Sequence, residues 1–127
     1  MEQTALDTVK EMWIAYREQG VEVALHHLHP NVEFVAEDGV VWEGHDGVRE
    51  FFERFERRGR RFSAAPYTFE PLGRGVVVVG HRRIRSADGQ RANAENLYFS
   101  HRVDAGLITR LAAWDTREEA ERDARAG

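Results

Sequence analysis

The chain has 127 residues, a formal net charge of −4 and no cysteine. This length suits a single domain over residues 1–127, which can bury a core but is too short to divide in two. The lack of cysteine excludes disulfides and thiolate chemistry, and the net charge argues against a general nucleic-acid binder. Because we find neither an apolar run of membrane-spanning length nor a targeting segment, we expect a soluble, cytoplasmic protein that does not bind membranes.

The N-terminal part of the sequence predicts two helices. Apolar residues recur at three- and four-residue spacing up to Gly20, which predicts an amphipathic helix over residues 4–19 with a C-terminal glycine cap. A second, shorter helix begins at Val21 and is expected to end before Pro30.

A short hairpin and a third helix follow. The alternating residues of 32–42, interrupted by Asp38-Gly39, predict the hairpin. His45 or Asp46 can cap a helix with an apolar stripe of valine and phenylalanine that ends at Gly59. Residues 62–72 then form an extended segment, which two prolines restrict to an edge or bulged strand.

Residues 75–116 predict two consecutive antiparallel hairpins. Asp88-Gly89 is typical of a two-residue type I′ turn, and residues 104–106 of a three-residue loop with glycine in the left-handed position. Counted outward from these turns, the pairs are Ile84 with Asn93, Arg82 with Glu95, Gly80 with Leu97, Val78 with Phe99, Val103 with Leu107, Phe99 with Leu111, Leu97 with Ala113 and Glu95 with Asp115.

The alternation of side chains divides these strands into two faces. The inner face is mostly apolar, and it also holds Arg82, Glu95, His101 and Asp115. The outer face is expected to be wetter, with arginines beside Val77, Val79, Tyr98 and Trp114. After the second hairpin, Thr116 and Glu119 form a capping box for a charged, mostly exposed helix over residues 117–125. The order of elements therefore predicts an α+β fold, with helices on the concave face of a curved antiparallel sheet.

Arg82, Glu95 and Asp115 are expected in one row across the inner face. Away from water, two neighbouring carboxylates cannot both ionise freely, so the row could supply an acid–base pair with arginine as electrostatic stabiliser. The alternative is a structural ion-pair cluster at the open end of the sheet. A bulge in the middle strand would instead move Glu95 to the other face.

No cofactor or metal site is expected. His26, His27 and His29 lie close in sequence, but their spacing does not bring three imidazoles to one side of a helix. A lone histidine such as His101 is more often a satisfied core or surface residue than a catalyst.

Four motifs together resemble the SnoaL-like branch of the NTF2-like superfamily over nearly the whole chain. They are Leu28-His29-Pro30-Asn31-Val32-Glu33-Phe34, the segment 43–52 beginning Glu43-Gly44-His45-Asp46-Gly47, Asp104-Ala105-Gly106-Leu107-Ile108 and Trp114-Asp115-Thr116. The resemblance implies a cone-shaped α+β barrel, about three helices from the N-terminal half on the concave face, a short C-terminal helix and an apolar pocket. Members of this family include polyketide cyclases, ketosteroid isomerases and limonene-epoxide hydrolases.

The resemblance does not decide the chemistry. We expect a cofactor-independent enzyme that acts by isomerisation, hydrolysis or cyclisation on a small hydrophobic molecule, which is expected to be cyclic. Asp115 matches the position of the acid–base aspartate of the polyketide cyclases, and His101 lies near their strand histidine. We assign Asp115 as base, Glu95 as acid and Arg82 as stabiliser, with His101 as a further catalytic candidate. The candidate substrate-binding residues are Trp13, Tyr16, Phe34, Trp42, Phe55 and Phe99, although core packing also explains them.

The alternative function is a non-catalytic module that binds a small ligand or serves a structural role. In either case the resemblance implies a homodimer through the outer face of the sheet. Tyr98, Trp114, Val77 and Val79 would form the centre of that interface, with Arg83, Arg102 and Arg110 at its rim.

Overall fold

The structure is a computed structural model that describes residues 4–63, 68–73, 75–85 and 92–126. The described residues form four α-helices, one short 3₁₀ helix and seven strands. In chain order these are α1 (Ala5–Gln19), α2 (Val21–Ala24), the 3₁₀ helix η1 (Leu25–His27), β1 (Leu28–Val35), β2 (Val41–Glu43), α3 (Gly44–Arg57), β3 (Arg60–Ser63), β4 (Phe69–Leu72), β5 (Gly75–Arg85), β6 (Ala92–Asp104), β7 (Leu107–Trp114) and α4 (Arg117–Arg125).

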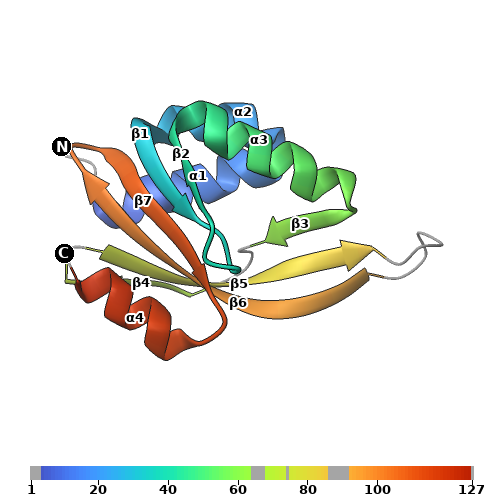
Figure 1. The fold of residues 1–127 in the computed structure, drawn as a ribbon. Helices are drawn as coiled ribbons and strands as arrows, with labels where there is room; N and C mark the ends of the chain where they lie inside the picture. The colour runs from blue at the N-terminus through green and yellow to red at the C-terminus, as the bar shows by residue number, and fades with distance from the viewer. Residues whose placement is uncertain (1–3, 64–67, 74, 86–91, 127) are drawn as a thin grey trace.

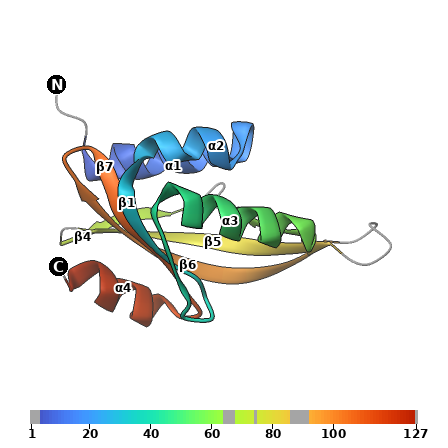
Figure 2. The same ribbon diagram turned by 45° about the horizontal axis from the view of Figure 1, so that its top comes forward.

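The strands build one curved, open sheet between two layers of helices. Helices α1, α2 and α3 lie on one face, whereas α4 lies on the opposite face (Figures 1 and 2). The strand order is β2-β1-β7-β6-β5-β3, and β4 also pairs with β5. The expected α+β fold is confirmed. The sheet is mixed, because β1 runs parallel to β7, and it does not close into the expected barrel. This long-range pair has no local turn signal in the sequence.

The N-terminal helices follow the predicted pattern. Thr4 caps α1 by accepting a hydrogen bond from the backbone N–H of Asp7 at 3.1 Å, and Gly20 ends the helix with a φ of 90°. The third helix is the exception, because its N-cap is Glu43 rather than His45 or Asp46. His45 lies instead in the first turn, where its Nε2 is 2.9 Å from the carbonyl oxygen of Leu28.

The first long hairpin has the register predicted for it. Val78 pairs with Phe99, Gly80 with Leu97, Arg82 with Glu95 and Ile84 with Asn93. The turn at Asp88-Gly89 itself lies outside the described residues. No bulge interrupts this pairing, so the backbone of Glu95 keeps the predicted alternation.

The second hairpin differs from the prediction by two residues. Its loop holds two residues, Ala105 and Gly106, both with positive φ, so that Asp104 pairs with Leu107. A bulge at Thr109 adds one further step, and Phe99 therefore pairs with Ala113 rather than with Leu111. A shift of two residues preserves the faces but changes every partner.

The main core lies between the sheet and helices α1 to α3. Val76, Val78, Leu97, Phe99 and Leu111 contribute from the inner face, as alternation predicts. Phe62 on β3 is central to an aromatic cluster in this core, and its ring centroid lies 4.4 Å from that of Phe55 and 5.2 Å from that of Phe99. This aromatic packing fixes α3 above β3 and β6.

Helix α4 covers part of the outer face, which was expected to be wet. Ala120 and Ala124 pack on Val77, which is 1% exposed, and Leu72, Tyr98 and Trp114 surround them. The helix is therefore amphipathic rather than mostly exposed, and Val77 is not available at the surface. In the described ranges, no helix is long and apolar enough to cross a membrane.

The predicted strand over residues 62–72 is in fact two short strands. Both β3 and β4 pair with β5, and Pro66 between them lies outside the described residues. Their positions next to one long strand agree with the predicted edge or bulged character.

Candidate functional site

A small apolar cavity lies between the helical layer and the sheet. Its volume is about 10 Å³, close to that of a single water molecule. The lining side chains come from α1, α2, α3, β1 and β7, and none carries a charge: Met12, Trp13, Tyr16, Val21, Ala24, Leu28, Val48, Phe52 and Leu111. Such walls favour an apolar occupant over water.

Two of the six predicted substrate-binding residues line this cavity, namely Trp13 and Tyr16 on α1. The other four do not line it. Phe34, Phe55 and Phe99 are buried in the surrounding core, and Trp42 is half-buried on β2, where it packs against Phe51 at 5.6 Å. Core packing accounts for these positions.

His101 lies beneath Trp13 and is 1% exposed. The indole Nε1–H of Trp13 donates to His101 Nε2 at 2.9 Å. This bond places the imidazole proton on Nδ1, which lies 3.0 Å from the carbonyl oxygen of Val76 and donates to it. Burial lowers the pKa of His101 to about 4, so the imidazole is neutral at pH 7. With both nitrogens engaged, the side chain connects α1 to the sheet.

Two of the three predicted acid–base positions, Arg82 and Glu95, are paired in the sheet, and Asp115 is not paired with them. The backbone of Arg82 pairs with that of Glu95 and also with that of the buried Phe62, which places the three positions in one row. The side chains of Arg82 and Glu95 lie outside the described residues. Asp115 is exposed and follows the last residue of β7, and the observed register does not place it opposite Glu95.

An ion pair joins α2 to α3 beside the cavity. Glu22 receives two hydrogen bonds from Arg49, at 2.6 Å from Nε and 3.1 Å from Nη2. Each residue directly follows a cavity-lining residue, Val21 on α2 and Val48 on α3. The hydrogen bond to Arg49 lowers the pKa of Glu22, and the same bond raises the pKa of Arg49.

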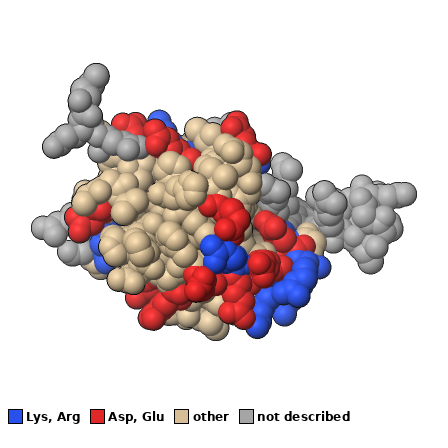
Figure 3. Space-filling view, turned by 90° about the horizontal axis from the view of Figure 1, so that it is seen from above, with Lys and Arg blue, Asp and Glu red and all other residues tan. Residues whose placement is uncertain are grey.

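The helical side of the molecule carries many acidic side chains around an uncharged surface (Figure 3). They belong mainly to α1, α2 and α3, with arginines from α3 among them. Within the described ranges, no three histidine or acidic side chains are grouped as a metal site would require.

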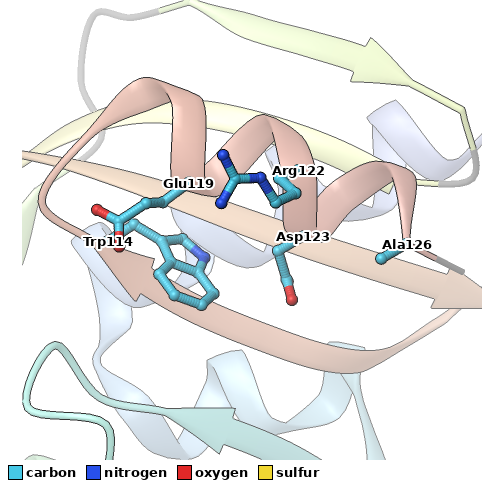
Figure 4. Close-up of a pocket in the computed structure, with 5 residues that line it drawn as sticks. All are labelled: Trp114, Glu119, Arg122, Asp123 and Ala126. Atoms are coloured by element: carbon cyan, nitrogen blue, oxygen red, sulfur yellow. The ribbon is translucent and has the colours of Figure 1, made fainter.

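A second hollow, of about 260 Å³, lies on the outer face between α4 and β7 (Figure 4). Trp114, Glu119, Arg122, Asp123 and Ala126 line it. At its base, Trp114 Nε1 donates to Ser100 Oγ at 2.9 Å, and Ser100 Oγ donates to Asp123 Oδ2 at 2.6 Å.

Arg110 completes this outer-face network. Its Nη2 donates to Asp123 Oδ1 at 2.8 Å, and its Nη1 bonds Glu33 on β1. Burial alone would raise the pKa of Asp123, but the bonds from Arg110 and Ser100 together outweigh it, so the pKa is lowered. The network ties α4 to three strands.

Sequence reasoning missed both charge clusters. Glu22 and Arg49 belong to different helices, and Ser100, Arg110 and Asp123 to three different elements. Periodicity reports which side of an element is apolar but not which polar groups meet across elements. The one available signal was the isolated aspartate in α4, at the same helical phase as the buried alanines.

Comparison with solved structures identifies the fold. An NTF2-like protein of unknown function from Burkholderia pseudomallei superposes with a TM-score of 0.76 and 23% identity, over 95% of this chain and 97% of that chain. TerC, co-crystallised with polyporic acid, superposes with a TM-score of 0.75 and 24% identity, over 97% of this chain and 98% of that chain. A proposed polyketide cyclase from Xanthomonas campestris superposes with a TM-score of 0.72 and 18% identity, over 94% of this chain and 96% of that chain.

No protein-family model matches the sequence. No curated protein matches it either. The structural similarity therefore shows the fold alone.

Proposed function

Starting from the NTF2-like fold of this chain, we propose that the interior between helices α1 to α3 and the sheet binds a small, flat, apolar molecule. The observation that carries the proposal is the uncharged cavity walled by Trp13, Tyr16 and Phe52. Aromatic walls favour planar ligands through stacking and edge contacts, and burial of apolar area supplies the affinity. The protein is then a ligand-binding module of this fold.

The size of the cavity sets a condition on binding. At about 10 Å³ it admits no aromatic ring in the conformation described here, so a ligand must displace part of the helical layer. Helix α2 is the smallest part of that layer, with four residues. TerC, of similar fold, was crystallised with polyporic acid, and that protein supports an organic molecule as the kind of ligand to test.

Acid–base catalysis is the second candidate, favoured by the backbone pairing of Arg82 with Glu95 next to the buried Phe62. In this proposal Glu95 exchanges a proton with a ligand in the interior and Arg82 stabilises the developing charge. Isomerisation, hydrolysis and cyclisation all fit such a pair. His101 has no part in it, because both ring nitrogens are occupied.

The binding proposal is tested with 2-naphthol, a small planar probe, and two matched leucine variants. Leu111 lines the cavity and Leu97 does not, although both are almost fully buried. Each truncation to alanine should cost about 2–5 kcal/mol of unfolding free energy. We expect 2-naphthol to raise the melting temperature of the native protein, and to raise that of Leu111→Ala more than that of Leu97→Ala.

Equal stabilisation of both variants would place the probe elsewhere and overturn the proposed site. Loss of binding in Ala24→Leu, which fills the cavity from α2, is the complementary expectation. For the catalytic candidate, Glu95→Gln should abolish turnover of any substrate found while leaving its binding intact; unchanged turnover would remove Glu95 from the mechanism.

A further inference from the structure

We propose that α2 is a gate to the interior cavity and that the ion pair between Glu22 and Arg49 holds it shut. This inference rests on the proposed ligand-binding function and adds the route by which a small apolar molecule reaches the site. The route is the seam between α2 and α3.

The first argument is the position of α2. Its residues Val21 and Ala24 form part of the cavity wall, and Val48 and Phe52 of α3 form the neighbouring part. The seam between these helices therefore leads from the surface to the cavity. Figure 1 shows α2 beside α3 at the top of the helical layer.

The second argument is the way α2 is attached to the chain. It has a single turn, and Gly20 precedes it with a φ of 90° and a ψ of −174°. A Cβ at Gly20 would meet no atom within 4 Å, so open space surrounds this link. The glycine lets a short helix rotate about this link, and the packing that such a rotation opens is that of Val21 and Ala24 on the core.

The third argument is the bond across the seam. Arg49 contacts Glu22 through two nitrogen atoms, while its Nη1 bonds Asp46 on its own helix at 2.8 Å. The two side chains are exposed, 36% for Arg49 and 63% for Glu22. An exposed pair of this kind contributes little stability, so it can break and re-form, as a gate requires.

Three titratable residues, His26, His45 and Asp46, act on this ion pair. His26 follows α2, His45 lies at the start of α3, and Asp46 shares Arg49. His45 lies on the α3 side of the seam, opposite Glu22, whereas His26 lies on the same side as Glu22. Because the pKa of Glu22 is lowered by its bond to Arg49, the test is made at neutral pH, where Glu22 is ionised.

The test measures access to Trp13, which lines the cavity and is 5% exposed. Trp42→Phe and Trp114→Phe make Trp13 the only tryptophan, and acrylamide, a small neutral quencher, reports how often the interior opens. Glu22→Arg replaces the attraction with a repulsion. We expect the quenching constant to rise about two- to fivefold, the range for loss of an exposed pair.

Two further variants make the result specific. Glu50→Arg breaks the pair that Glu50 forms with Arg54 at 2.6 Å within α3, which does not cross the seam, and should leave quenching unchanged. The double variant Glu22→Arg/Arg49→Glu restores an opposite-charge pair across the seam and should restore the native quenching constant. Hydrogen exchange of the Ala24 amide, in chains that keep all tryptophans, provides a second reading of the same opening.

Equal quenching in Glu22→Arg and Glu50→Arg, or a double variant as open as Glu22→Arg, would overturn the gate. The binding proposal is tested separately from the gate, because the affinity for 2-naphthol is measured on the native chain. If the native protein binds 2-naphthol but Glu22→Arg changes neither quenching nor exchange, the gate fails alone. If quenching follows the pair but no probe binds, the ligand-binding proposal fails and the opening of α2 stands.

Discussion

Trp13 donates its indole N–H to Nε2 of His101 at 2.9 Å, across 88 residues of sequence. The bond joins the helical layer to the middle of the sheet and fixes the tautomer of a fully buried imidazole. Since Trp13 also lines the cavity, this pair anchors the wall of the proposed ligand site.

Acid should unfold the protein partly through His101. Its pKa is about 4 in the folded chain against 6.5 for an unburied histidine, so between these values the unfolded state binds more protons. The contribution of neutral His101 to the free energy of unfolding is fully present above pH 6.5. It falls by about 3 kcal/mol as the pH drops toward 4. Urea unfolding at a series of pH values measures this slope.

Two histidine variants test the assignment of that slope. His26→Gln alters an exposed residue and should keep the native pH dependence. His101→Phe should be less stable at pH 7, because Trp13 Nε1 and the carbonyl oxygen of Val76 lose their partner, yet its stability should change less with pH. An unaltered slope in His101→Phe would refute the burial argument.

Gly75 should be intolerant of a side chain. A Cβ there would lie 2.6 Å from the carbonyl oxygen of His101 and 2.9 Å from that of Ala124, so α4 would have to move away from the sheet. We expect Gly75→Ala to cost about 1–3 kcal/mol or more in thermal unfolding. Gly106→Ala, at a turn glycine with no atom near its Cβ, should show only the smaller backbone cost of positive φ.

Asp123 should be the most sensitive charged position of α4. Its carboxylate accepts from Ser100 and Arg110, and its side chain is 16% exposed. Asp123→Ala leaves both donors without this partner and should cost about 1–3 kcal/mol of unfolding free energy. Glu118→Ala removes an exposed pair with Arg122 on the same helix and should change stability by less than about 1 kcal/mol. Similar costs for both would contradict the network.

Asp115 should be dispensable for ligand binding. It is exposed beyond the end of β7 and does not line the cavity. Asp115→Asn is therefore expected to bind 2-naphthol with unchanged affinity in calorimetric titration. A large loss of affinity would return Asp115 to the interior site that the sequence predicted for it.

The sequence predicted the elements well because their signals are local. Gly20 ends α1, Thr116 begins α4, and the first long hairpin keeps the register counted from its turn. The predicted register of the second hairpin was wrong, because the loop length and the bulge each shift the pairing by one residue. The pattern of apolar residues around Ala105 and Thr109 gives no signal of either shift.

The candidate site was less predictable because it depends on contacts between distant elements. Alternation placed His101 on the inner face, as found, but could not reveal that Trp13 occupies its second nitrogen. The same reasoning left Val77 at the surface, since the buried side of α4 comprises only two alanines and so carries a weak apolar signal. The outer-face dimer stays a proposal, and α4 covers Val77, one of the residues expected at its centre.

The most direct measurement of the central claim is a methyl NMR titration of the native protein with 2-naphthol. The account predicts shifts at the methyl groups of Val21, Val48 and Leu111, which line the cavity, and none at Val77 beneath α4. Shifts confined to Val77, or no shift at any of these methyl groups at saturating probe, would contradict an interior ligand site.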